Sequence, residues 1–237
     1  MSKRNPIDHQ ICNQNQNQSD IEQIEKRQSP QEIEDLRRPE RRDAAENRQR
    51  ILTVARQLFA AHGVENVTMY QIAKATGIGQ GTLYRRYANK GELCFALIES
   101  SFLQLCDEID RDLAQLALSQ TYLAQLDHLL GQLVTFVEAQ IHLLGAIEDA
   151  AIGHKRQEKF CSPLYGMIHQ RVCQLLDAAM AAGEILPLNS PFTADALLAT
   201  LNIELYQFQR HQRGFTPDQI LQGIRAIYVD RLRVSSL

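Results

Sequence analysis

The residues between Gln80 and Arg86 have the side-chain chemistry that nucleic-acid binding requires. Amide, hydroxyl and guanidinium groups donate hydrogen bonds to base edges and to phosphate oxygens. The side chains of this kind, together with one aromatic ring, are Gln80, Thr82, Tyr84, Arg85 and Arg86. If these residues share the exposed side of one helix, that helix can read DNA.

Two short helices joined by a tight turn must position these side chains. Thr68 and Gln71 form a capping box, which predicts a helix that begins after Thr68 and ends before Gly77. Gly77 and Gly79 follow, and a glycine takes a positive φ without steric cost, so the chain can turn sharply there. A second helix is predicted over residues 80–87. This spacing indicates a helix-turn-helix.

The apolar residues of the same stretch fit the packing of that motif. Ala73 is small enough for the second helix to cross the first, Ile78 fills the turn, and Leu83 anchors the second helix. Helix–glycine–helix hairpins also occur in all-α proteins that bind no DNA. The spacing alone therefore leaves a purely structural role open.

The string TMYQIAKATGIGQGTLYRRYANK closely resembles the DNA-binding domain of the TetR family of transcriptional regulators. The resemblance continues upstream through ILTVARQLFAAHGVENVT and covers about Arg48–Ile98. The rest of the chain is similar only in its all-helical layout. The resemblance implies a DNA-binding regulator, most often a repressor, whose second domain typically holds an apolar pocket for a small effector.

The resemblance also implies roles for individual residues. In the family, the lysine that matches Lys90 contacts a phosphate beside a helix N-terminus, where backbone N–H groups also face the anion. We expect phosphate contacts from Thr68, Tyr84 and Lys90, and base contacts from the second helix. The full set expected to bind DNA is Thr68, Gln80, Gly81, Thr82, Tyr84, Arg85, Arg86 and Lys90.

The distribution of charge agrees with a polyanionic partner. The chain as a whole has a net charge of −3. Residues 37–90 carry eleven Lys and Arg against four Asp and Glu, whereas residues 91–237 carry ten against seventeen. Positive charge is thus concentrated on and just before the predicted helix-turn-helix, where DNA would bind. A helical protein that used this motif only for packing would not need such a distribution.

Three regions are predicted along the chain. Residues 1–43 form a disordered, Asn/Gln-rich tail followed by a basic arm, because this composition buries too little apolar surface to fold alone. Residues 44–93 form the helix-turn-helix domain, and residues 94–237 form an effector-binding and dimerisation domain. The basic run Arg37–Arg42 is either a solvated linker or an arm that contacts DNA.

The fold class predicted is all-α, with a three-helix DNA-binding domain and a C-terminal helical bundle. Capping residues, first-turn prolines and glycine stops mark nine helices. Their ranges are 44–62, 68–76, 80–87, 89–118, 121–144, 146–159, 162–182, 191–213 and 217–235.

The last two predicted helices are expected to form a homodimer, because a helix-turn-helix protein usually reads two half-sites. The family resemblance implies the same, with two helices from each subunit in a four-helix bundle. The apolar residues at helical spacing are Phe192, Ala196, Ala199, Ile203 and Tyr206 in 191–213, and Ile220, Ile224, Ile227 and Leu232 in 217–235. The alternative is that these stripes cover the chain's own core.

Large apolar residues on three predicted helices are candidates for the lining of an effector pocket. They are Phe102, Phe136, Tyr165 and Ile168. Ordinary core packing would use the same residue types at the same spacing, so the sequence leaves both interpretations open.

The sequence contains no recognisable catalytic or metal-binding motif, so we expect no enzyme activity, cofactor or metal. The five cysteines form no CxxC pair, and with no signal peptide or long apolar run a cytoplasmic protein is expected. The predicted function is a ligand-responsive DNA-binding repressor. The alternatives are a redox-sensing regulator, with Cys161 near three basic residues, or one without an effector.

Overall fold

The computed structural model describes residues 30–151 and 162–234, with side chains from residue 44 onward within those ranges. The chain divides into two compact units between Ile51 and Leu52, and each is described by itself. The described part of the first unit is the beginning of one helix. The predicted tail up to residue 29 lies outside the described residues, as do Cys12 and Cys161.

Helix α2 spans Pro30–His62, so it begins well before Ala44, where the sequence predicts its start. Proline is favoured in the first helical turn, and the residues that follow are rich in Glu, Arg and Leu, which are strong helix formers. The run Arg37–Arg42 therefore has a helical backbone, but its side chains are not among those described. Its contact with DNA stays a prediction. Gly63 ends α2 with a φ of 81°.

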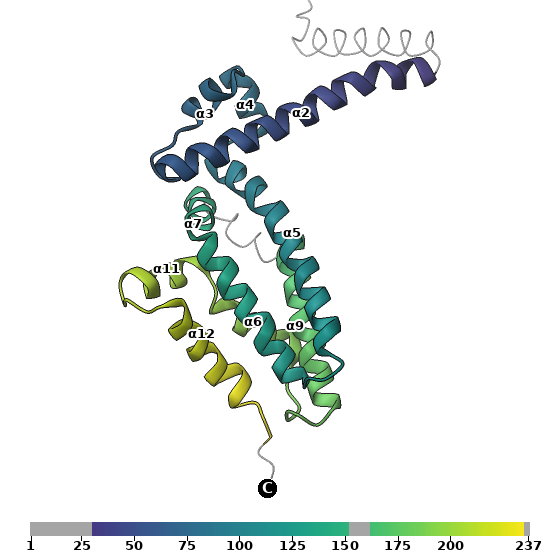
Figure 1. Ribbon diagram of the computed structural model, residues 1–237, viewed down its shortest axis with the longest axis vertical. Coiled ribbons are helices and arrows are strands. Elements are labelled where there is room, and N and C mark those ends of the chain that lie inside the picture. Colours follow the sequence, from purple (N-terminus) through teal and green to yellow (C-terminus); the bar gives the residue numbers. More distant parts are fainter. Residues whose placement is uncertain (1–29, 152–161, 235–237) are drawn as a thin grey trace, which may run out of the picture. The chain divides into compact units, whose positions relative to one another are not determined.

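In the second unit, three helices pack together behind the end of α2. They are α3 (Met69–Thr76), α4 (Gln80–Arg86) and the beginning of α5 (Lys90–Leu116), and α3 and α4 lie next to each other in Figure 1. These helices, the end of α2 and the segments between them contribute buried apolar residues. They are Phe59, Val64, Val67, Met69, Ile72, Leu83, Tyr87 and Leu93.

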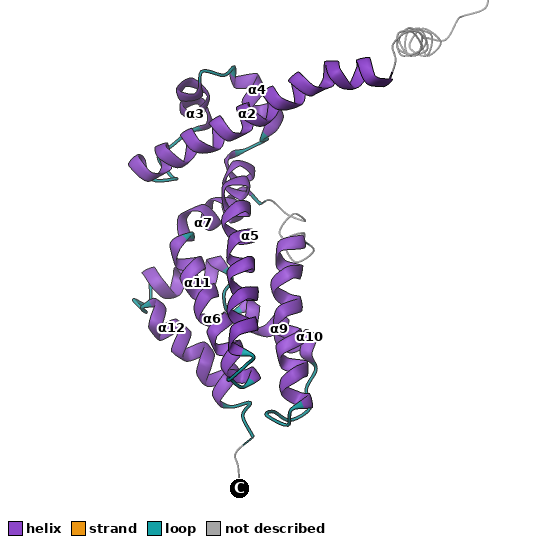
Figure 2. Cartoon of the chain, turned by 45° about the vertical axis from the view of Figure 1, so that its right-hand side comes forward, coloured by secondary structure: helices purple, strands orange, loops and turns teal. Residues whose placement is uncertain are grey.

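A larger core lies between helices α5, α6 (Tyr122–Ala139) and α9 (Pro163–Ala181), which run side by side (Figures 1 and 2). Each helix contributes fully buried aliphatic side chains, as its 3.6-residue periodicity predicts. Those with the least exposure include Ile109, Leu129, Leu130, Val172 and Leu176. Burial of this apolar surface is the main force that holds the bundle together.

The helix predicted over residues 121–144 is two helices in the structure. α6 ends at Ala139, and α7 (Ile141–Ala150) leaves at an angle of 73°. No glycine or proline marks this junction, so the bend comes from tertiary contacts. The Gln207 side chain donates to the Ile141 carbonyl oxygen at 3.3 Å, and α7 packs against the beginning of α5. The second half of the predicted helix 146–159 lies outside the described residues.

The helix predicted over residues 191–213 is also divided, into α10 (Ser190–Ala199) and α11 (Ile203–His211). Asn202 begins the second helix, because its side chain accepts a hydrogen bond from the Glu204 N–H at 3.0 Å. The last predicted helix is α12 (Pro217–Arg225), which continues as a short π-helix, η2 (Ala226–Asp230).

Much of the stripe predicted to face a second subunit is buried in the chain's own core. Ile203, Tyr206, Ile220 and Ile224 are each at most 8% exposed, so for these residues the core interpretation is the correct one. Phe192 and Ile227 are exposed, and a different apolar group is exposed on α11.

A polar cluster fastens α11 to the end of α6. Arg210 donates from Nε and Nη2 to the two carboxylate oxygens of Glu138, at 2.8 and 2.7 Å, and the Tyr206 hydroxyl donates to the same carboxylate at 2.9 Å. The hydrogen bonds from Arg210 hold the pKa of Glu138 below its usual value. A third contact, from Arg210 to the Phe215 carbonyl oxygen, reaches the loop before α12.

Glu184 joins three segments at the other end of the bundle. Its carboxylate accepts hydrogen bonds from the N–H groups of Tyr122 and Leu123 at 2.9 Å, and thus caps the beginning of α6. Its own N–H donates to the Ala179 carbonyl oxygen in α9, and its carbonyl oxygen accepts from the Val234 N–H. One residue therefore ties α9, α6 and the segment after η2 together.

The all-α prediction is confirmed, since the described residues form ten α-helices and one π-helix. Within those same ranges the extended pairing is limited to a single antiparallel bridge between Ile185 and Arg233. No single helix in the described part of the chain is long and apolar enough to cross a membrane. The bent pair α6 and α7 meets those criteria only when its members are counted together.

Candidate nucleic-acid interface

The capping box predicted at Thr68 is present at the beginning of α3. The Gln71 N–H donates to the Thr68 hydroxyl oxygen at 3.3 Å, and the Thr68 N–H donates to Gln71 Oε1 at 2.7 Å. These reciprocal bonds satisfy two backbone groups that the helix itself cannot pair. They fix the point at which α3 leaves the loop that precedes it.

The turn between α3 and α4 depends on one glycine. Gly77 has φ 69° and ψ 20°, in the left-handed region that only glycine adopts without strain, and the N–H of Ile78 bonds the Ala73 carbonyl oxygen at 3.2 Å. Gly79, by contrast, has φ −62° and ψ 139°, which any residue can adopt. The sharp angle between the two helices is therefore set at Gly77.

Helix α4 presents the predicted DNA-binding side chains to solvent and holds itself by one buried residue. Leu83 is completely buried against the apolar core, and Ala73 of α3 is buried beside the turn. Tyr84 is 44% exposed. The other exposed residues of α4 are Gln80, Gly81, Thr82, Arg85 and Arg86. Two guanidinium groups, an amide and two hydroxyls thus lie on one short helix that Leu83 anchors.

Lys90 lies at the beginning of α5, but its ammonium group points to the protein backbone. Nζ donates to the carbonyl oxygens of Val64 at 2.7 Å, Val67 at 3.2 Å and Glu65 at 3.4 Å. An ammonium has three N–H donors, so all of them have partners in this loop. The arrangement differs from the expected phosphate contact, because Lys90 here fastens the loop before α3 to α5.

The N-terminus of α5 is held in two further ways. The Asn89 side chain accepts from the Glu92 N–H at 2.9 Å, and the Glu92 carboxylate accepts from the Ala88 N–H at 2.8 Å. Gly91 faces α7 so closely that a Cβ atom placed there would lie 2.4 Å from the Ala150 Cβ. This close approach joins the DNA-binding helices to the rest of the second unit, and no sequence motif marked it.

Two exposed residues of α3 were not singled out from the sequence. Tyr70 is 58% exposed, and Lys74 is exposed in the last turn of the helix. A phenol and an ammonium are both common phosphate contacts. The available signal was their position on the polar side of α3, opposite the buried Met69, Ile72 and Ala73.

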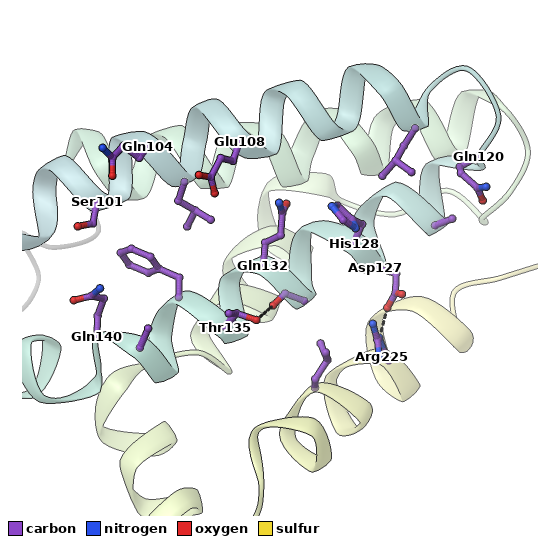
Figure 3. Close-up of a pocket in the computed structure, with 17 residues that line it drawn as sticks. Ser101, Gln104, Glu108, Gln120, Asp127, His128, Gln132, Thr135, Gln140 and Arg225 are labelled. Carbon is purple, nitrogen blue, oxygen red and sulfur yellow. Dashed lines mark hydrogen bonds and ion pairs between the residues drawn. The ribbon is translucent and has the colours of Figure 1, made fainter.

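A cavity of about 720 Å³ lies between α5, α6 and α12 (Figure 3). Phe136 lines it, and the ring of Phe102 packs edge-on against Phe136 with centroids 5.7 Å apart. The Tyr165 hydroxyl instead donates to Asp195 at 2.6 Å, and Ile168 is buried in the main core. The structure therefore does not bring the four predicted effector residues into one described cavity.

The described cysteines are poorly suited to sense oxidants. Burial raises the pKa of the Cys94 thiol to about 11, and it also raises the pKa of Cys106 and of Cys173. The thiolate is the form that reacts, and a raised pKa lowers the fraction of thiolate near neutral pH. Cys161, which the redox alternative invoked, lies outside the described residues.

A short exposed helix with basic and polar side chains, anchored by one leucine and preceded by a glycine turn, is the reading head of a helix-turn-helix DNA-binding protein. Known proteins agree with this class. Residues 51–97 match the family described as bacterial regulatory proteins, tetR family. An HTH-type transcriptional regulator of Staphylococcus aureus is 31% identical over 199 residues, which are 81% of this chain and 97% of that relative. The chain belongs to the TetR family of transcriptional regulators.

Solved structures share the fold. FadR of Thermus thermophilus, a TetR-family transcriptional repressor solved in complex with lauroyl-CoA, is 18% identical with a TM-score of 0.64. The likeness covers 80% of this chain and 97% of that one. The ketosteroid transcriptional regulator KstR2 of Mycobacterium tuberculosis is 21% identical with a TM-score of 0.51, over 79% of this chain and 95% of its own. At these identities the likeness concerns the fold alone.

Proposed function

We propose that this regulator is a homodimeric repressor that a small molecule releases from its operator. The observation that carries the proposal is the exposed face of α4, where polar and basic side chains surround a helix anchored by the fully buried Leu83. Helix α4 is short, and the major groove of DNA admits an α-helix. Effector binding would shift the population from dimers whose two α4 helices match the spacing of the half-sites to dimers whose spacing does not match.

In this proposal α4 enters the major groove, and Gln80, Thr82 and Arg85 or Arg86 contact base edges. Thr68 and Tyr84 contact phosphates on either side, and Gly81 lets the backbone approach the DNA closely. Tyr70 and Lys74 of α3 are added as phosphate contacts because they are exposed. Each base contact accounts for about 1–3 kcal/mol of discrimination.

The proposed dimer contact uses an apolar group that we call the α11 patch, consisting of Leu205, Phe208 and Phe215. These side chains are 42%, 45% and 42% exposed, although residues of this type are usually buried. Leu205 and Phe208 are three positions apart, which places them on one side of α11. A twofold contact through this patch would bring the same surface of two chains together.

Two alternatives give different results in one experiment. A regulator without an effector would bind its operator whatever small molecule is added. A redox-sensing regulator would lose affinity on oxidation and recover it on reduction. The raised pKa values of Cys94, Cys106 and Cys173 favour the small-molecule proposal over the redox one.

A mobility-shift assay on DNA from the gene's own upstream region, at two salt concentrations, tests the proposal. We expect a salt-sensitive complex that excess random DNA does not disrupt. Arg85→Ala should lower specific affinity by about tenfold or more, because a bidentate base contact accounts for about 1–3 kcal/mol. Arg111→Ala, which removes an exposed arginine of α5 away from α4, is the matched control. Equal losses in both variants would contradict the role of α4.

A further inference from the structure

The cavity between α5, α6 and α12 is large enough for a small organic molecule. Its volume of about 720 Å³ falls within the range of ligand pockets in proteins, roughly 300–1,000 Å³. Figure 3 shows Ser101, Gln104 and Glu108 of α5 across the cavity from Gln132 of α6 and from Gln140, which follows α6. Phe136 of α6 also lines it. The walls therefore combine one aromatic ring with several hydrogen-bonding groups.

Some of the charged side chains that line this cavity have a partner of opposite charge, and Glu108 has none among the described residues. Asp127 and Arg225 are hydrogen-bonded to each other, so the guanidinium already has an anionic partner. His128 contacts Asp112 at 3.0 Å. Among the described residues, the carboxylate of Glu108 has neither a hydrogen bond nor an ion pair, although it lines the cavity. The cavity thus offers an unpartnered negative charge, and its one arginine is already paired.

Gln132 adds an unpartnered acceptor. Its Nε2 donates to the Asp112 carboxylate at 2.8 Å, and because an ionised carboxylate can only accept, the amide must keep this orientation. Its Oε1 is buried, and no donor reaches it within the part of the chain that the structure describes. A buried carbonyl oxygen without a donor is unfavourable. A ligand with N–H groups would satisfy it once the Gln132 side chain shifts enough to expose the oxygen to the cavity.

We propose that the effector is an organic cation, an amine or guanidine on an apolar stem. Its N–H groups would donate to Gln132 Oε1 and face the Glu108 carboxylate, and its stem would pack on Phe136. This inference rests on the proposed effector-responsive function. An anionic ligand, such as the lauroyl-CoA bound by the Thermus thermophilus repressor, would place its negative charges near Glu108.

A pair of probes that differ mainly in charge tests the proposal on the full chain. 4-Phenylbutylamine and 4-phenylbutyrate share the same stem, and ligands of this size bind at about millimolar affinity. Calorimetric titration should show that the amine binds at least about tenfold more tightly than the carboxylate. Equal binding of both probes, tighter binding of the carboxylate, or no binding of either at millimolar concentrations would overturn the proposal.

Variants then locate the bound amine. Glu108→Gln and Gln132→Leu should each weaken amine binding by about tenfold. Asp107→Asn is the matched control, since it removes the same charge from the neighbouring position of α5, which does not line the cavity. If Glu108→Gln and Asp107→Asn act alike, the amine does not bind where we place it.

Operator binding by the ligand-free protein is measured in the same preparations. This separates the two proposals, because a failure of the ligand assignment leaves the specific mobility shift intact. If the repressor proposal is wrong, no specific mobility shift is seen, whichever probe binds.

Discussion

At the scale of single residues, the structure differs most from the sequence-based expectation at Lys90. The motif places it where a family lysine contacts a phosphate, yet its three donors are directed to the carbonyl oxygens of Val64, Glu65 and Val67. Nothing in the sequence shows where a long, flexible side chain will point. We therefore propose that Lys90 acts on DNA binding by holding the loop that precedes α3.

Lys90→Met tests this role through the salt dependence of operator binding. If the residue only positions the loop, affinity and melting temperature fall while the slope of log K against log salt is unchanged. The expected loss of stability is about 2 kcal/mol, since a charged donor loses buried carbonyl partners. Loss of a phosphate contact would instead reduce the slope by about 0.9 per contact. Lys74→Gln, which removes the charge from a proposed phosphate contact, provides the reference for that change in slope.

Glu138 gives a residue-scale prediction about pH. Arg210 holds its pKa below the ordinary value of 4.5, so the ionised form is more stable in the folded chain than in the unfolded chain. The associated stability is complete above pH 4.5 and is lost as pH falls through the lower, folded-state pKa.

We expect Glu138→Gln to lower the free energy of unfolding by about 1–3 kcal/mol at neutral pH, because Arg210 and Tyr206 lose an ionised acceptor. The difference from the unmodified chain should shrink in acid, below pH 4.5. Urea titrations over a pH series measure it. Asp230→Asn, at an exposed carboxylate, should show no such trend, and a constant difference for Glu138→Gln would argue against the assignment.

At the scale of elements, the close approach of α5 and α7 depends on Gly91. Gly91→Ala should cost about 1–3 kcal/mol, because its Cβ has no space beside Ala150 and the two helices must separate. Gly223→Ala, in α12, is the matched control. A Cβ atom placed there has no neighbour within 4 Å apart from the adjacent residues and the backbone of its own helix. It should be neutral or stabilise by up to about 1 kcal/mol. Thermal melts compare them, and equal stability of the two variants would mean that α7 adjusts freely.

The elements that the sequence predicts best are those with local end signals. The sequence predicts a cap at Thr68, and Thr68 accepts the expected backbone hydrogen bond in the structure. Asn89 and Thr216 cap the helices that follow them in the same way. These signals work because the unpaired N–H groups of a helix end need an acceptor nearby in the chain. The helix-turn-helix could therefore be predicted almost residue by residue.

The elements that the sequence misses are set by distant contacts. The bend between α6 and α7 occurs at Gln140 without a glycine or proline, and Gln207 helps to hold it from α11. Apolar periodicity also cannot show whether a stripe faces a second subunit or the chain's own core. It predicts Tyr206 and Ile220 at a dimer surface, whereas both are buried in the core of the chain. The cavity depends on the same distant packing, and only Phe136 of its lining was anticipated.

At the scale of the whole molecule, the α11 patch predicts the oligomeric state. Leu205→Glu combined with Phe208→Glu should give a monomer in sedimentation experiments, because each chain would bury two carboxylates in the twofold contact. Operator affinity should fall on the order of a hundredfold, since the two reading heads would no longer be linked. Leu118→Glu changes another exposed leucine, 87% exposed after α5, and should leave the dimer intact. A double variant that still sediments as a dimer would place the contact elsewhere.

The position of Glu184 has a mechanical consequence. Because it caps α6 and is bonded to α9 and to the segment after η2, these three segments are held together at the beginning of α6, directly after the turn from α5. A rod clamped at one end deflects most at the other. A molecule that wedges between α5 and α6 would therefore move the N-terminus of α5, where Lys90 and Gly91 lie, more than the clamped turn. Glu184 would then hold the fixed end of this movement. Without its hydrogen bonds, both ends of the bundle could shift, and a smaller displacement would reach the helix-turn-helix.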